Sequence, residues 1–200
     1  MAELNRLLQK IDAELDNSVA RLFQLARIPS ISTDPHYKED CRKAARWLTD
    51  DLAHNGFDAS LRDTAGHPMV VAHYSHPGHD PETPHLLFYG HYDVQPADPL
   101  GMWKTPPFEP ELRRDSDGVE RLYGRGLSDD KGQLMTFVEA FRLWLAVIGP
   151  LPIRVTVLLE GEEESGSPSL VAFLEANRRE LSCDAAFICD TGMWSERMPA

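Results

Sequence analysis

Apolar and polar residues alternate along this chain in two rhythms, and the change of rhythm marks out the expected helices and strands. Over residues 3–26, apolar residues recur at helical spacing with charges between them, which is typical of an amphipathic helix. Short, nearly continuous apolar runs further along indicate buried strands. The pattern predicts helices over residues 3–26, 39–55, 131–147 and 168–179, and strands over residues 57–62, 69–74, 85–89, 153–159 and 185–189.

Helices and strands alternate after the second helix, and we find no internal repeat. This order predicts an α/β fold with a mixed, mainly parallel sheet flanked by helices. A long Pro-containing connection joins the strand ending at Tyr89 to the helix beginning at Lys131, and it contains a strand-like run at residues 120–123. A length of 200 residues with 42% hydrophobic composition is enough for one domain with a sizeable core.

The overall charge narrows the classes of partner. There are 20 Lys and Arg against 32 Asp and Glu, so the formal net charge is -12. An acidic chain without a Lys/Arg-rich run argues against binding to nucleic acid or to an anionic membrane. No stretch approaches the roughly 18 apolar residues of a membrane span, and the N-terminus lacks the apolar core of a signal peptide. The odd number of cysteines, Cys41, Cys183 and Cys189, favours reduced thiols. We therefore expect a cytoplasmic protein.

Three polar clusters carry candidate metal ligands, and each follows an apolar, strand-like run. They read GHYDVQP at residues 90–96, GRGLSDDKG at residues 124–132 and EGEEESGS at residues 160–167. In an open α/β sheet, ligands bind outside the carboxyl ends of the strands, so the clusters are expected to converge on one site. None contains Cys, and imidazole with carboxylate suits ions such as Zn²⁺, Mn²⁺ or Co²⁺. The sequence predicts a hydrolytic metal centre.

The spacing of residues within the clusters suggests which side chains bind metal, which orient a ligand and which transfer protons. His91 and Asp93 lie two positions apart, so on an extended backbone they point to the same side, and Asp93 can orient the His91 ring. Glu163 and Glu164 are adjacent and must diverge, which allows one to bind metal while the other handles protons.

At these residues the chain resembles the co-catalytic zinc hydrolases, the family of acetylornithine deacetylase, succinyl-diaminopimelate desuccinylase, carboxypeptidase G2 and the carnosine-type dipeptidases. The motifs are most similar to the dipeptidase branch, and the resemblance extends from the segment at residues 28–32 to Asp190. Carried over residue by residue, it implies metal ligands at His91, Asp129, Glu164 and Asp190, with Asp129 bridging two Zn²⁺ ions. It also implies that Asp93 supports His91, that Glu163 is the general base, and that the Asp129–Asp130 peptide is cis.

The resemblance implies hydrolysis of a peptide or amide bond in a small peptide or N-acyl amino acid by water activated between two metals. Such relatives supply one more His from a C-terminal segment and carry a lid or dimerisation domain, and some are homodimers. Every His of this chain lies at or before His91. We therefore expect residues 1–200 to be the N-terminal part of the catalytic domain, C-terminally incomplete and weakly active or inactive alone.

Other interpretations stay open at this point. Asp129 or Asp130 can cap the helix that follows, since Asp is a favoured N-cap residue. Glu162 is expected in a solvated acidic turn, and the histidines of residues 73–85 are expected in a flexible surface loop. Alternative functions are a non-catalytic metal-binding remnant of the same fold, an N-acyl amino acid deacylase or desuccinylase, and an acidic interaction module without a metal site.

Overall fold

The computed structural model describes residues 2–195 and 198–199 and contains four α-helices and nine strands within those residues. The helices are α1 (Ala2–Ala26), α2 (Lys38–His54), α3 (Lys131–Val147) and α4 (Leu170–Ala176). The strands are β1 (Asp58–Arg62), β2 (Met69–Tyr74), β3 (His85–His91), β4 (Glu111–Arg114), β5 (Glu120–Tyr123), β6 (Arg154–Glu160), β7 (Ala185–Ile188), β8 (Met193–Ser195) and β9 (Met198–Pro199). None of the helices in these residues is long and apolar enough to cross a membrane.

The central sheet has five strands in the order β1-β2-β6-β3-β7. β3 is parallel to both β6 and β7, whereas β2 is antiparallel to β1 and to β6. All strands except β2 therefore point the same way, which confirms the predicted mixed, mainly parallel sheet. The carboxyl ends of β6, β3 and β7 meet at one edge, because these three neighbours share a direction.

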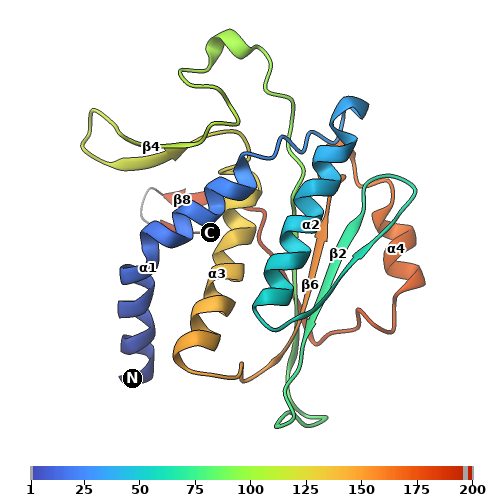
Figure 1. Cartoon of the computed structure of the whole chain (residues 1–200). Helices are drawn as coiled ribbons and strands as arrows, with labels where there is room; N and C mark the ends of the chain where they lie inside the picture. Colours follow the sequence, from blue (N-terminus) through green and yellow to red (C-terminus); the bar gives the residue numbers. More distant parts are fainter. Residues whose placement is uncertain (1, 196–197, 200) are drawn as a thin grey trace.

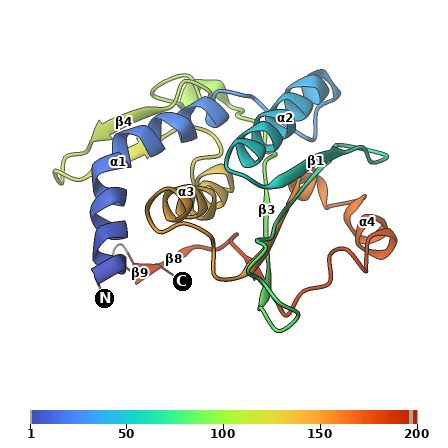
Figure 2. The same cartoon turned by 60° about the horizontal axis from the view of Figure 1, so that its bottom comes forward.

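Helices cover both faces of this sheet (Figures 1 and 2). The larger core lies between the sheet and α1, α2 and α3, and it includes Leu48, Val157 and Phe141. A smaller core on the opposite face packs Leu158 and Leu87 against the segment that contains α4. Because successive strand side chains point to opposite faces, Val157 and Leu158 serve different cores. The apolar runs of the sequence reflect this burial on both faces.

Several elements differ from the sequence prediction, among them β8 and β9, which it did not include. The helix expected over residues 168–179 is shorter, since α4 ends at Ala176. The Pro-containing connection holds a hairpin of β4 and β5, of which only the second strand was predicted. Side chains of β4 alternate between half-buried and exposed, so a four-residue strand of this kind gives too weak a pattern to detect.

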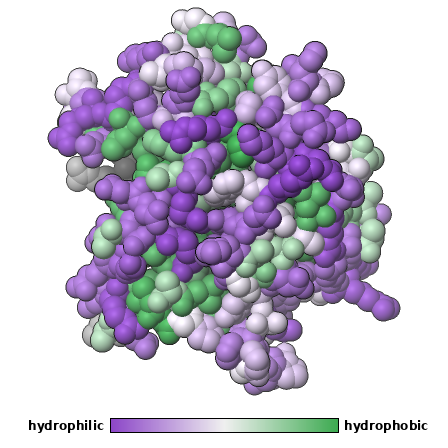
Figure 3. All heavy atoms as spheres, in the orientation of Figure 1, coloured by the Kyte–Doolittle hydropathy of each residue, from purple (hydrophilic) through white to green (hydrophobic). Residues whose placement is uncertain are grey.

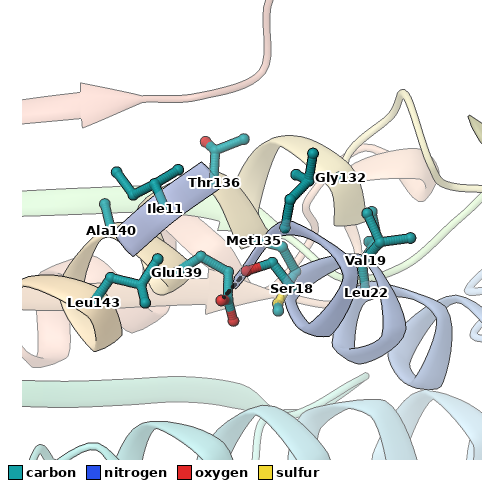
Figure 4. Close-up of a pocket in the computed structure, with 11 residues that line it drawn as sticks. Ile11, Ser18, Val19, Leu22, Gly132, Met135, Thr136, Glu139, Ala140 and Leu143 are labelled. Atoms are coloured by element: carbon teal, nitrogen blue, oxygen red, sulfur yellow. Dashed lines mark hydrogen bonds between the residues drawn. The ribbon is translucent and has the colours of Figure 1, made fainter. Parts of the chain in front are cut away.

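An apolar pocket of about 310 Å³ lies between α1 and α3 (Figure 4). In the surface view, hydrophobic atoms gather on the same side, at the lower left of Figure 3. The polar residues that line this pocket are Ser18, Thr136 and Glu139. The Glu139 carboxylate accepts hydrogen bonds from Ser18, Arg21 and Arg142. Arg21 also pairs with Asp51 of α2 at 2.7 Å. This set, hereafter the Glu139 network, ties three helices together.

Candidate metal centre

Residues from all the predicted clusters meet at the carboxyl edge of the sheet. His91 is the last residue of β3, Glu163 follows β6, Asp190 follows β7, and Asp129 precedes α3. His91 Nε2 lies 3.0 Å from Asp129 Oδ1, 3.8 Å from Asp190 Oδ2 and 3.9 Å from Glu163 Oε2. Donor atoms of His91, Glu163 and Asp190 all lie within 4.8 Å of one another. Four segments distant in sequence thus place their side chains around one imidazole nitrogen.

The two nitrogens of the buried His91 ring face different surroundings. Nδ1 lies 3.2 Å from the Asp93 carbonyl oxygen and 3.3 Å from Asp93 Oδ1, which are both acceptors. The Nδ1 proton is therefore held by Asp93, and Nε2 is the nitrogen that faces the carboxylates. Metal-binding histidines in proteins commonly show this arrangement, since the bonded nitrogen fixes the ring and its tautomer.

Asp93 is fully buried and serves a second segment as well. Its Oδ1 accepts from the backbone N–H of Glu163 at 3.3 Å, and its Oδ2 accepts from the N–H of Glu164 at 3.1 Å. One carboxylate thus fixes both the His91 ring and the turn that carries the two glutamates. The predicted position of Asp93 beside the His91 ring agrees with this geometry.

The site is short of positive charge. Burial alone lowers the pKa of His91, but the hydrogen bond to Asp93 and the charges of Asp93, Asp130 and Asp129 outweigh it and raise the pKa to about 10. Within the described residues, the ion pairs of Asp129, Glu163 and Asp190 are all with His91, and no Lys or Arg pairs with them. Carboxylate oxygens and an imidazole nitrogen without a counter-cation are a donor set that fits a divalent metal ion.

The Asp129–Asp130 peptide is cis, as the resemblance implied. Asp130 is the N-cap residue of α3, yet its side chain makes no capping bond. Instead, Asp130 Oδ2 accepts from the backbone N–H of His91 at 2.9 Å, and burial raises the pKa of this carboxyl to about 7. The capping interpretation is therefore wrong for the Asp130 side chain, which positions His91.

The two adjacent glutamates diverge as expected. Glu163 points to the His91 cluster, whereas Glu164 Oε2 accepts from Gln95 Nε2 at 2.6 Å. Burial raises the pKa of the Glu164 carboxyl. The division into Glu163 as base and Glu164 as ligand stays a prediction. Gln95 was not foreseen, although it lies in the first motif two residues after Asp93.

The expectation that Glu162 lies in a solvated turn is wrong. Its side chain is buried and accepts from the backbone N–H of His67 at 3.0 Å and of Ser169 at 3.2 Å. A Cβ at Gly66 would lie 1.5 Å from Glu162 Oε1, so only glycine allows this approach. A run of acidic residues looks solvated in sequence, but here the sheet end and the 63–68 loop enclose it.

The histidines of residues 73–85 are only partly in a surface loop. His76 is exposed, but His73 in β2 and His85 in β3 are half-buried, and both contact the Thr156 hydroxyl, at 2.9 Å and 2.7 Å. The surface-loop interpretation is wrong for these two. Across the described residues, the only group of potential ligands that lies close enough for one ion is that of His91, Glu163 and Asp190.

Comparison with known proteins agrees with this arrangement. Residues 87–200 match the model of peptidase family M20/M25/M40. The chain is 31% identical over 196 residues to the Cys-Gly metallodipeptidase of Schizosaccharomyces pombe, covering 93% of this chain and 40% of that protein. The chain belongs to this peptidase family. It is also 30% identical over 211 residues to the human Beta-Ala-His dipeptidase, covering 100% of this chain and 41% of that protein.

Solved structures of M20/M25/M40 relatives share the fold. The di-peptidase Dug1p of Saccharomyces cerevisiae superposes with a TM-score of 0.82 at 30% identity, over 96% of this chain and 42% of its own. Human carnosine dipeptidase 1 superposes with a TM-score of 0.83 at 29% identity, over 96% of this chain and 41% of its own. The resemblance to the dipeptidase branch is thereby confirmed. The chain spans about two-fifths of the length of the curated relatives it matches.

Proposed function

We propose that this chain carries the metal-binding part of a dipeptidase that hydrolyses the peptide bond of small peptides. The observation that carries the proposal is the convergence of His91 with Asp129, Glu163 and Asp190 on one point at the sheet edge. The dipeptidase names of the relatives support small peptides as the substrate class.

His91, Asp129, Asp190 and Glu164 would hold two divalent ions, for which Zn²⁺ is our first choice and Mn²⁺ or Co²⁺ the alternatives. Bound there, such ions supply Lewis-acid polarisation of the scissile carbonyl and lower the pKa of water. Glu163, whose carboxylate faces the His91 cluster, takes the proton from the attacking water and returns it to the leaving amine. Asp93 keeps the His91 ring and the Glu163 backbone in fixed relation during these transfers.

The test is metal analysis of the purified chain together with hydrolysis of Cys-Gly and β-Ala-His by the metal-loaded protein. Glu163→Gln is expected to lower turnover about 10²–10⁴-fold, the usual contribution of a general base, while the metal content is unchanged. Glu175→Gln, on the exposed face of α4, is the matched control and is expected to leave turnover unchanged.

Two results would contradict the proposal. One is a purified wild-type chain that takes up no divalent metal ion. The other is a Glu163→Gln protein that retains wild-type turnover.

A further inference from the structure

Lys131 is a fully buried lysine that the mechanism above does not use. It is the first residue of α3 and follows directly on Asp129 and Asp130. Within the described residues its ammonium group pairs with no carboxylate. Its Nζ donates instead to two backbone carbonyls far away in sequence, to Ile28 at 2.6 Å and to Leu25 at 3.3 Å. Burying an amine is costly unless it is hydrogen-bonded in this way. We therefore ask what the buried Lys131 contributes to the protein.

The carbonyls that Lys131 binds belong to a segment that encloses Asp93. Just after Ile28, the Ser30 hydroxyl donates to the Tyr92 carbonyl at 2.7 Å. The Val94 N–H donates to the Ser30 carbonyl at 3.0 Å, and Ile31 forms a parallel bridge with Val94. The segment at residues 25–31, hereafter the 25–31 strap, therefore holds the backbone on both sides of Asp93.

The other end of the Lys131 side chain is fixed to the second motif. A Cβ placed on Gly126 would lie 2.7 Å from Val94 Cγ1 and 3.3 Å from Lys131 Cδ, so the lysine stem packs in the narrow space beside this turn. The same motif sends Asp130 to the backbone N–H of His91. Lys131 thus lies where the Asp129–Asp130 turn and the 25–31 strap meet.

We propose that Lys131 is a positioning residue, which holds the Asp129–Asp130 turn in register with the strap around Asp93 and so sets the metal affinity of the site. The inference depends on the proposed metal centre. Groups that orient metal ligands typically change metal affinity about 10- to 100-fold when they are removed. A lysine acting only through its charge would have the opposite effect, because removing a positive charge near the site favours cation binding.

The experiment is a Co²⁺ titration of the purified chain, followed by the visible absorption of the bound ion. Lys131→Met keeps the length of the stem and removes the hydrogen bonds. It is expected to weaken Co²⁺ binding about tenfold or more and to alter the absorption spectrum. Val138→Ala, at a buried position on the same helix, is the matched control for lost stability and is expected to keep both affinity and spectrum.

The outcomes separate the inference from the proposed function. No Co²⁺ binding by the wild-type chain would contradict the metal centre itself. Wild-type binding with unchanged or tighter binding in Lys131→Met would overturn the role of Lys131 alone, as would equal weakening in Val138→Ala. If Lys131→Met does not fold, Ser30→Ala tests the same connection from the strap, and unchanged Co²⁺ affinity there overturns the inference.

Discussion

Two clusters of buried or half-buried acids stabilise this molecule in opposite ways. In the Glu139 network, Arg21 and Arg142 donate to the carboxylate of Glu139, and these bonds lower its pKa despite its burial. At the sheet edge, the carboxylates around His91 have no guanidinium or ammonium partner within the described residues. There the His91 imidazole is the cation of the cluster, and its pKa rises to about 10.

The difference distinguishes an acid that serves the fold from acids that serve a site. An acid of the first kind carries its own cations, so removing it leaves buried charge unpaired. The acids of the second kind outnumber their one internal cation, His91, so they repel one another until a further cation from solution joins them. Clusters with strongly perturbed titration are candidates for function, and the presence or absence of internal partners decides between the two.

The largest effect on stability is expected from breaking the Glu139 network, in which arginines pair with the buried acid. Glu139→Ala leaves Arg142 with only its 3.7 Å pair to Glu14, and Arg21 with only its pair to Asp51. It should lower the free energy of unfolding by about 3 kcal/mol, the lower end for a broken buried pair, because both arginines retain one acid. Urea unfolding measures the change. Glu175→Ala is the control, expected within about 0.5 kcal/mol of wild type. A Glu139→Ala loss equal to that of the control would mean that the network is not stabilising.

Binding of Zn²⁺ to the carboxylates around His91, which have no Lys or Arg partner within the described residues, should give the next largest effect on stability. At a Zn²⁺ concentration one hundred times its Kd, the free energy of unfolding of the wild-type chain should rise by about 2.7 kcal/mol, and chelator should reverse the gain. His91→Ala should show no gain, whereas Glu139→Ala should show the full gain from a lower starting point. Equal stabilisation of wild type and His91→Ala would place the ion elsewhere.

Removing one acid of the His91 cluster should change the free energy of unfolding by a smaller amount, and in the opposite direction to Glu139→Ala. Asp190→Asn relieves repulsion at the sheet edge and should raise the stability of the metal-free chain by about 0.5 kcal/mol, as surface-charge changes commonly do. With Zn²⁺ present, the wild-type chain should be more stable than Asp190→Asn, because the variant has lost a metal ligand. Paired thermal scans with and without the ion measure both signs. A metal-free Asp190→Asn that is less stable than wild type contradicts the account.

The smallest effect is expected at Glu180, an acid near the surface that pairs with Arg62 and His73. Arg62 donates to both of its oxygens, at 2.7 Å and 2.5 Å, and His73 contacts it at 2.9 Å. The Arg62 bonds, with desolvation opposing them, lower its pKa from 4.5 to about 2. A carboxyl with a lowered pKa stabilises the fold above its ordinary pKa, and this contribution is lost as pH falls from 4.5 towards 2. Acid titration of stability should therefore be shallower in Glu180→Gln, and superimposable curves would exclude the effect.

The sequence predicted the scaffold better than it predicted the environment of single side chains. The sheet could be foreseen because strands buried on both faces, such as residues 153–159, leave long apolar runs. The convergence of the first and third motifs followed from their places after two strands of this sheet. Asp190 came only from the family resemblance, and Asp129 follows β5, which belongs to a separate two-stranded sheet. Burial of Glu162 and Lys131 could not be foreseen, since it depends on loops at residues 63–68 and 25–31 that fold back from elsewhere in the chain. Charged residues in polar motifs give no local signal of such partners.

The central claim is that His91 Nε2 and the surrounding carboxylates bind divalent metal. Anomalous diffraction at the zinc absorption edge, from crystals of the chain grown with Zn²⁺, tests it most directly. The account predicts a peak about 2.0–2.1 Å from His91 Nε2, with carboxylate oxygens of Asp129 and Asp190 at about 2.0–2.2 Å. A chain with Zn²⁺ elsewhere, or with no peak beside His91, would contradict it.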